Sequence, residues 1–309
     1  MAGTSERAAA AVAEGIVPTL SELVALRAAA SGRRVARQGR YGVSGHALSP
    51  LRGRGMEYAE SREYTPSDDA RHIDWRLTAR TGRAHTKLFQ AERERLTLLV
   101  ADTAPALYFG TRVRFKSVQA ARAGAIAAWA AVRDGDRIGA MRGSAQEAPI
   151  APAAGARGAL RVLDALTRWY ARAPSDDQGL AFAMDHAQRV LRPGSRLVVL
   201  AHPASVASLP ERRWPALAQH HEVIVLLMVD PLETAPPVAA LPFVSGGHRV
   251  DLDLASAAQR QRWQREFVKP VQDAIESLPA RGVRVQALSS DAPSESWLPL
   301  LGRSGPRVA

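Results

Sequence analysis

Short apolar runs recur from residue 96 onward, and longer stretches with helical spacing of apolar residues lie between them. A run such as Val223–Val229 lacks polar alternation, which is typical of a strand buried on both faces of a parallel sheet. The alternation of strands and helices predicts an α/β fold with a mostly parallel, Rossmann-like sheet flanked by helices. The predicted strands are 96–101, 137–141, 196–201, 223–229 and 283–288. The predicted helices are 115–133, 158–172, 180–191, 211–219 and 258–278, with Gly135 and Gly194 as left-handed caps.

The pattern weakens toward the N-terminus, where Leu20, Leu23, Val24 and Leu26 predict one short helix at Ser21–Ala30. The charged segment before residue 95 predicts extended strands with a tight turn, packed as a β segment on the α/β domain. We therefore expect four parts. They are a helix with a partly flexible basic linker at 1–40, the extended segment at 41–94, the α/β domain at 95–292 and a C-terminal tail at 293–309.

Composition narrows the class of protein. At 309 residues with 46% hydrophobic content, the chain is long enough to bury a large core. It has no cysteine, which excludes disulfides and thiolate metal sites and favours a reducing compartment. The apolar runs are shorter than the ~20 residues of a membrane-spanning helix, and the first residues do not resemble a signal peptide. We expect a cytoplasmic protein without membrane insertion.

The formal net charge is +11, which invites a nucleic-acid interpretation. Arginine supplies nearly all of this charge, and it is interleaved with acidic residues along the chain. The one concentrated patch is Arg33, Arg34, Arg37 and Arg40. We interpret the patch as a solvated or partner-facing segment. Nucleic-acid binding is the alternative, and it predicts an affinity that falls steeply with salt.

Residues 53–95 carry a high density of carboxylates, guanidiniums and aromatic rings. A planar guanidinium can hold a carboxylate through two parallel hydrogen bonds, so Arg–Asp pairs can fasten irregular backbone. Asp68 and Asp69 are also placed to cap a helical turn at Ala70–Trp75. The elements of this motif, in chain order, are Gly53–Gly55, Glu57-Tyr58, Arg62-Glu63-Tyr64, Pro66 with Asp68-Asp69, Arg71, Ile73-Asp74-Trp75-Arg76, Thr78-Ala79-Arg80, Lys87, Phe89 and Glu92–Arg95.

In this order and spacing, the motif resembles the family named domain of unknown function 58, and the likeness extends over roughly residues 40–290. The resemblance implies a body similar to a von Willebrand factor A domain. It also implies a role beside MoxR-type AAA+ ATPases and other von Willebrand A-like proteins, in the assembly or maturation of protein complexes. Many relatives carry membrane helices near the N-terminus, and this chain looks like a variant without them.

The resemblance also implies a metal-ion-dependent adhesion site, built on an Asp-x-Ser-x-Ser loop after the first core strand. Here that loop has Asp102, but Ala104 and Ala106 stand at the two serine positions. Gln178 takes the place of the threonine, and His202 follows a later strand where the family often has Ser-Asp. Methyl groups cannot ligate Mg²⁺, which prefers a near-octahedral set of oxygens. We therefore predict a degenerate site without metal or other cofactor, in which Asp102 bonds loop amides.

The charged motif has three competing interpretations. It is a structural clasp that docks the segment on the α/β domain, a partner-binding surface anchored by Tyr64 and Trp75, or the acid–base site of a hydrolase that uses Asp68, Asp69 or Asp74. The leading function is a non-enzymatic interaction module that needs no metal. The residues concerned are Arg62, Glu63, Tyr64, Asp68, Asp69, Arg71, Asp74, Trp75 and Arg76.

Overall fold

The computed structural model describes residues 15–31, 56–66, 68–91, 95–245 and 248–301. The chain forms two compact units. The α/β body comes from the chain before residue 41 and after residue 94, and the signature unit comes from residues 41–94 between them. The arginine patch at 33–40 lies outside the described residues, so the nucleic-acid alternative stays a prediction.

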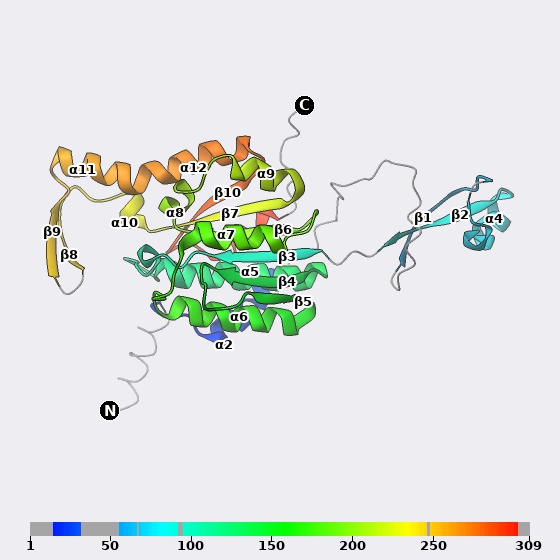
Figure 1. Cartoon of the computed structure of the whole chain (residues 1–309), viewed down its shortest axis with the longest axis horizontal. Helices are drawn as coiled ribbons and strands as arrows, with labels where there is room; N and C mark the ends of the chain where they lie inside the picture. Colours follow the sequence, from blue (N-terminus) through cyan, green and yellow to red (C-terminus); the bar gives the residue numbers. More distant parts are fainter. Residues whose placement is uncertain (1–14, 32–55, 67, 92–94, 246–247, 302–309) are drawn as a thin grey trace. The chain divides into compact units, whose positions relative to one another are not determined.

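A six-stranded sheet forms the centre of the α/β body (Figure 1). All neighbouring strands are parallel except the last pair, in which β5 runs antiparallel to β4. The structure confirms all five predicted strands. The four-residue edge strand β5 was missed, because it contains Pro152 and is too short for a periodic signal. In spatial order the strands are β10 (Arg284–Ser289), β7 (Glu222–Val229), β6 (Arg196–Ala201), β3 (Leu96–Ala101), β4 (Arg137–Arg142) and β5 (Ile150–Ala153).

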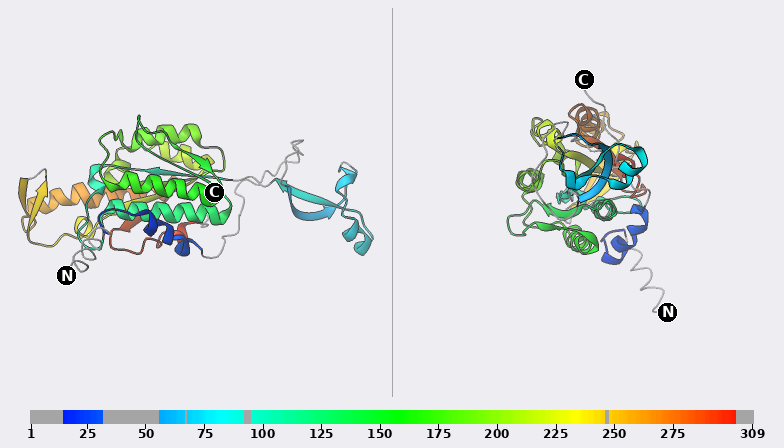
Figure 2. Two further views of the ribbon diagram at one scale, coloured as in Figure 1. Left: turned by 90° about the horizontal axis from the view of Figure 1, so that it is seen from below. Right: turned by 90° about the vertical axis from the view of Figure 1, so that its right-hand side faces the viewer.

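Helices cover both faces of the sheet, which gives three layers (Figures 1 and 2). Alternate residues of each strand point to opposite faces, so Leu99 packs into one core and Leu98 into the other. The first core is closed by α5 (Lys116–Asp134) and α6 (Gly155–Ala171). The second is closed by α7 (Gly179–Val190), α8 (Pro203–Ala207), α9 (Arg213–His220) and α12 (Lys269–Ala280).

The long helix predicted at 258–278 is continuous but not uniform. It consists of α11 (Ala257–Trp263), a π-helical turn at 264–268 and α12. Before it, α10 (Pro231–Thr234) leads into a hairpin of β8 (Ala240–Ser245) and β9 (His248–Asp253). We did not predict this hairpin, although the Gly-Gly pair between its strands is a known hairpin signal.

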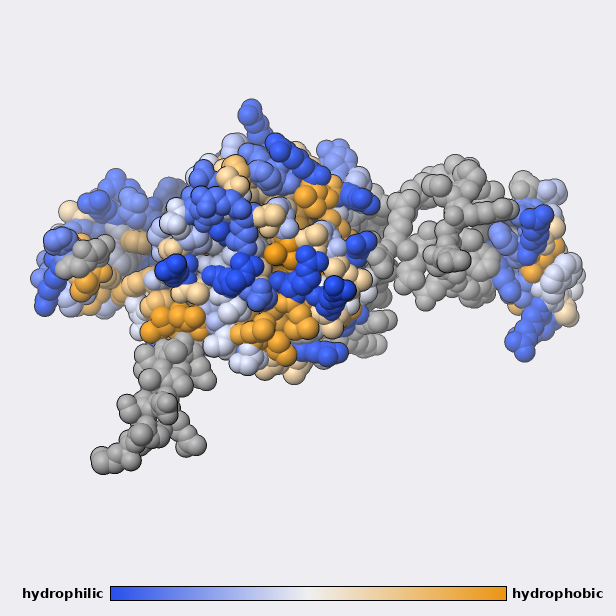
Figure 3. All heavy atoms as spheres, turned by 60° about the horizontal axis from the view of Figure 1, so that its bottom comes forward, coloured by the Kyte–Doolittle hydropathy of each residue, from blue (hydrophilic) through white to orange (hydrophobic). Residues whose placement is uncertain are grey.

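The N-terminal residues form two short helices, α2 (Leu20–Ala25) and α3 (Arg27–Ala30), instead of the one predicted. They pack on α5: Leu23 is fully buried, and Trp129 donates its indole N–H to the Leu23 carbonyl at 3.1 Å. The outward side of α2 leaves Leu20 and Val24 exposed. Figure 3 shows a face of the α/β body on which apolar patches lie among hydrophilic residues.

The C-terminal residues correct one predicted boundary. We expected a tail from residue 293, but the described residues 293–301 belong to the α/β body. Trp297 is fully buried and Leu301 nearly so, and both belong to the first core.

The signature unit is an antiparallel pair, β1 (Met56–Glu63) and β2 (His85–Ala91), joined by a helical connection. That connection holds a 3₁₀ turn at Ala70–His72 and the helix α4 (Trp75–Thr81), which ends at Gly82 with φ 71°. We predicted strands, a tight turn and a helical turn at Ala70–Trp75 capped by Asp68 and Asp69. The 3₁₀ turn at Ala70–His72, which Asp69 caps, confirms part of that prediction. The helix α4, which begins at its cap Asp74, was not predicted.

No helix in the described ranges is both long and apolar enough to cross a membrane.

Candidate functional site

The carboxyl ends of the parallel strands meet at one edge of the sheet, where open α/β folds place their ligands. Asp102 directly follows β3 at this edge and is 1% exposed. One of its carboxylate oxygens accepts a hydrogen bond from the Ala104 amide at 3.0 Å, and the other accepts one from the His202 amide at 2.9 Å. The side chain therefore ties the end of β3 to the end of β6.

Burial raises the pKa of the Asp102 carboxyl above its ordinary value, and the nearby negative charge of Asp177 acts in the same direction. Hydrogen bonds from Ser205 and from the two amides oppose this rise without cancelling it. Both oxygens of this buried carboxyl group already accept hydrogen bonds from main-chain amides.

The other residues of the predicted metal site occupy local structural positions. Ala104 precedes the 3₁₀ turn at 105–107, and Gln178 precedes α7 without a capping bond from its side chain. His202 caps α8, because its Nδ1 accepts from the Ala204 amide at 3.3 Å. Burial lowers the pKa of His202 to about 3, so the imidazole is neutral. Ala106 lies exposed within the 3₁₀ turn.

Protein donors also occupy the remaining carboxylates at this edge. Asp176 holds the guanidinium of Arg142 through both oxygens, at 2.8 and 2.9 Å, and accepts from Ser144. Asp177 accepts from the Thr103 hydroxyl at 3.0 Å and from the Gly179 amide at 3.1 Å. These bonds fix the loop before α7 against the loop after β3.

Asp230, at the end of β7, fastens three segments. It accepts from the amide and hydroxyl of Thr111, from the Ser290 hydroxyl and from the Leu232 amide. Burial raises the pKa of the Asp230 carboxyl, but the hydrogen bonds of Ser290 and Thr111 outweigh this and hold it below the ordinary value. The network thus joins the loop before α5, β7 and the segment after β10.

A buried cation lies within the same network. Lys116, at the start of α5, is 0% exposed and pairs with Glu233, and its Nζ lies 5.7 Å from the centroid of the Phe109 ring. Burial lowers the pKa of Lys116 and raises that of Glu233. We did not single out Lys116 from the sequence, since nothing in its neighbourhood marks a lysine as buried.

Within the described ranges, no group of three or more His, Asp and Glu side chains is arranged to hold a metal ion. Asp177 acts electrostatically on Asp102 and accepts a hydrogen bond from the Thr103 hydroxyl. The hydrogen bonds described at this edge join its loops to one another.

In the signature unit, three aspartates accept hydrogen bonds from nearby backbone amides. Asp68 pairs with Arg62 at 2.6 Å and accepts from the Thr65 amide at 2.9 Å. The Thr65 amide lowers the pKa of Asp68, with smaller contributions from the Thr65 hydroxyl and Arg62. Asp69 accepts from the Arg71 amide at 2.9 Å, which caps the 3₁₀ turn.

Asp74 caps α4 by accepting from the amides of Arg76 and Leu77, at 3.2 and 3.1 Å. It also accepts from the Ser61 hydroxyl of β1, so the cap fastens the helix to the strand pair. The hydrogen bond from the Leu77 amide lowers the pKa of the Asp74 carboxyl.

The remaining residues of the motif make fewer contacts. Glu63 faces Arg83 across an exposed 3.6 Å ion pair, and the Tyr64 amide donates to the Ala84 carbonyl. Arg71, Trp75 and Arg76 are exposed. No side-chain hydrogen bond or ion pair joins these three to another residue in the described part of the unit.

A comparison with protein families identifies the family in which this motif occurs. The model of the family described as "Protein of unknown function DUF58" matches residues 60–272, which take in most of the signature unit and much of the α/β body. This chain belongs to the DUF58 family.

Similar curated proteins belong to mycobacteria. An uncharacterized protein of Mycobacterium bovis is 31% identical over 196 residues, which cover 63% of this chain and 62% of that protein. Uncharacterized proteins from two strains of Mycobacterium tuberculosis match with the same identity and coverage. The chain thus spans less than two thirds of the length of these relatives, and their names assign no activity.

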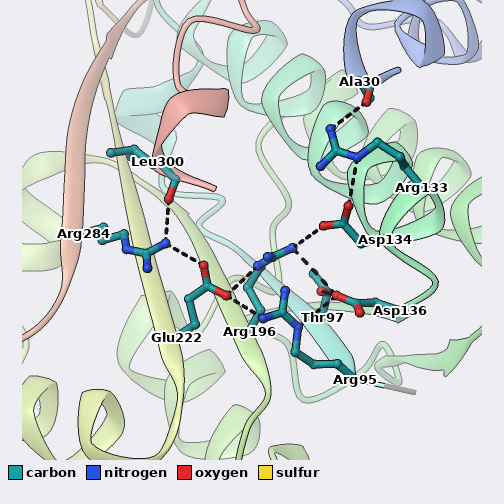
Figure 4. Close-up of polar contacts among 10 residues, drawn as sticks. All are labelled: Ala30, Arg95, Thr97, Arg133, Asp134, Asp136, Arg196, Glu222, Arg284 and Leu300. Atoms are coloured by element: carbon teal, nitrogen blue, oxygen red, sulfur yellow. Dashed lines mark hydrogen bonds and ion pairs between the residues drawn. The ribbon is translucent and has the colours of Figure 1, made fainter. Parts of the chain in front are cut away.

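At the opposite edge of this DUF58 protein's sheet, the amino ends of the strands meet in a network of ion pairs (Figure 4). Glu222, the first residue of β7, accepts from Arg95 at 2.7 Å, from Arg196 at 3.0 Å and from Arg284 at 2.6 Å. Burial raises the pKa of Glu222, but the three guanidiniums outweigh this and hold it below its ordinary value.

The same network extends to α3 and to the segment after β10. Arg284 also donates to the Leu300 carbonyl at 2.6 Å, and Arg133 donates to the Ala30 carbonyl at 3.0 Å (Figure 4). Sequence reasoning missed the network, because its members lie far apart in the chain. The available signal was a charged residue at the first position of a predicted strand or directly before it, as with Arg95, Arg196 and Glu222.

Proposed function

We propose that this DUF58 protein is a non-enzymatic protein–protein interaction module with a von Willebrand factor A-like body. Its partner is a MoxR-type AAA+ ATPase, with other von Willebrand A-like proteins as further partners, and its role is the assembly or maturation of other protein complexes. The partner assignment rests on the family resemblance, and the structure bears on how such a partner would be bound.

The strand order supports the von Willebrand A-like assignment. If the six strands of this sheet are numbered 1 to 6 in chain order, beginning with β3, their spatial order is 6-5-4-1-2-3. The edge strand β5, number 3 in this count, is the antiparallel one. This is a doubly wound order with a switch point beside β3, where Asp102 lies.

One observation carries the proposal that binding needs no metal: both oxygens of Asp102 accept main-chain hydrogen bonds. A metal at this position would have to compete with amide donors for a buried carboxylate. The two alanines in the loop could offer no side-chain oxygen, and Mg²⁺ releases its own water reluctantly. A partner is therefore held by hydrogen bonds and packing.

The hydrolase alternative loses support from the signature unit. General acid–base chemistry requires a carboxyl group within reach of a substrate proton. Asp68, Asp69 and Asp74 instead accept hydrogen bonds from neighbouring amides, and two of them have lowered pKa values. These are properties of capping residues.

The test is retention of a purified MoxR-type ATPase from the same organism by the immobilised full-length protein. We expect equal retention in magnesium and in excess chelator, with ATP omitted so that the nucleotide's own metal requirement does not interfere. Asp102→Asn should bind as well as the wild type if it remains folded. Failure to retain the ATPase, or release by the chelator alone, would refute the proposal.

A further inference from the structure

The side chains of the signature unit fall into two sets that the sequence could not separate. The carboxylates of Asp68, Asp69 and Asp74 are used by the unit's own backbone. The aromatic and cationic side chains of the helical connection face solvent. We call this second set, Arg71, Trp75, Arg76 and Arg80, the Trp75 face.

Trp75 is 70% exposed, although burying an indole is among the larger sources of stability available to a folded chain. The chain has six tryptophans, all within described parts, and the other five are buried. The unit itself does not use this ring: of its described side chains only Thr86 is buried. An indole left outside in this way is typical of a binding hot spot.

Three exposed arginines lie near Trp75 in the chain, on α4 and in the turn before it. Arg76 and Arg80 are one helical turn apart and therefore project from the same side of α4. Both are exposed, as is Arg71, and none has an ion pair with another described residue. Arg62 and Arg83, by contrast, already pair with Asp68 and Glu63. Among the arginines of the described unit, those without an ion pair are thus Arg71, Arg76 and Arg80.

We infer that the Trp75 face docks an acidic segment of a partner protein, with the indole as the central anchor and the three arginines as its charged rim. The inference deepens the proposed function, because it names the surface and the chemistry of the partner. Tryptophan and arginine are the residues most enriched where binding energy is concentrated. Carboxylates of an acidic segment can each accept two parallel hydrogen bonds from an unpaired guanidinium.

The charge of the whole unit favours a protein over a nucleic acid. Acidic and basic residues are equally numerous between residues 56 and 91, so the unit lacks the positive field that phosphate backbones require. An acidic protein segment needs only the local cations and the ring.

Collisional quenching of tryptophan emission tests the surface in the full-length protein. Since Trp75 is the exposed indole, iodide should quench one fraction of the emission, and cesium should quench it less because the arginines repel it. Trp75→Phe should abolish the quenchable fraction. If Trp75 is protected in the protein on its own, another part of the same chain covers it, and the inference is overturned.

Binding is then measured with poly-L-glutamate as the acidic probe, at low salt, from the protection of Trp75 against acrylamide. We expect protection in the wild type. The double variant Arg76→Glu, Arg80→Glu should bind poly-L-glutamate at least about tenfold more weakly than the wild type. The matched control is Arg161→Glu, an exposed unpaired arginine on α6, which should leave binding unchanged. Equal loss in the control, or no protection in the wild type, would overturn the inference.

Two further outcomes separate this inference from the proposed function. If the ATPase is retained equally by the wild type and by Trp75→Ala, the proposed function stands and the Trp75 face is not its docking surface. If poly-L-glutamate binds the face but no ATPase is retained, the surface stands and the named partner is wrong. Tighter binding of oligothymidylate than of poly-L-glutamate would make the face a nucleic-acid site and contradict the inference.

Discussion

At the scale of single residues, several acidic side chains in this protein accept hydrogen bonds from neighbouring amides. Asp102 joins the ends of β3 and β6, and Asp74 begins α4. The sequence predicted that Asp102 would bond loop amides, because a short carboxylate at a strand end readily does so. It did not predict Asp74 as a cap, since three aspartates lie close together and only the folded chain shows that Asp69 caps the 3₁₀ turn and Asp74 caps α4.

The capping role of Asp74 gives a prediction. Asp74→Ala removes the acceptor of the Arg76 and Leu77 amides and of the Ser61 hydroxyl, so α4 should be less stable and these two amides should exchange faster. Amide hydrogen exchange at Arg76 and Leu77 measures this directly. Asp74→Asn keeps a capping oxygen and should exchange nearly as slowly as the wild type. Unchanged exchange in the alanine variant would show that the residue is not a structural cap.

At the scale of elements, the strands of the central sheet could be predicted from the sequence, but the ion pairs that join neighbouring strands could not. Unbroken apolar runs such as Val223–Val229 need burial on both faces, so they identify themselves in the sequence. The hairpin of β8 and β9 has no such run, and α4 is too short for a helical period. The ion network at the amino edge depends on which strands become neighbours, and Glu222 meets Arg95 only because β7, β6 and β3 adjoin.

The Glu222 network leads to a prediction about stability and pH. Glu222→Gln leaves Arg196, whose side chain is 6% exposed, without its main countercharge, and should cost about 3–5 kcal/mol of unfolding free energy. Because the folded-state pKa of Glu222 is below the ordinary value of 4.5, its contribution is present above that pH. The contribution is lost as pH falls through the lowered pKa, so the variant and the wild type should converge in acid.

Urea unfolding at a series of pH values checks both parts of that prediction. The matched control is Glu211→Gln, which removes a surface pair with Arg281 in which the glutamate is 80% exposed, and which should cost less than about 1 kcal/mol. Equal losses in the two variants, or a Glu222→Gln deficit that grows toward acid pH, would contradict the assigned role.

At the scale of the whole molecule, the chain combines an α/β body closed by its own hydrogen bonds with a signature unit that leaves an indole in solvent. The alternation of strands and helices was enough to predict the body. The exposure of Trp75 could not be predicted, because a Trp beside Asp and Arg in sequence can equally well be a core residue. The sequence left the clasp and the partner surface as alternatives. The structure shows that Asp68, Asp69 and Asp74 accept hydrogen bonds within the signature unit, and the Trp75 face is our proposal for the partner surface.

The central claim is that protein donors close the carboxyl edge of the sheet, so that it binds no divalent metal. A titration of Mn²⁺, which takes the same oxygen ligands as Mg²⁺, into the full-length protein tests this most directly. The electron paramagnetic resonance signal of free Mn²⁺ should be unchanged at equal concentrations of protein and metal. A loss of signal that Mg²⁺ reverses, and that is absent from folded Asp102→Asn, would contradict the account.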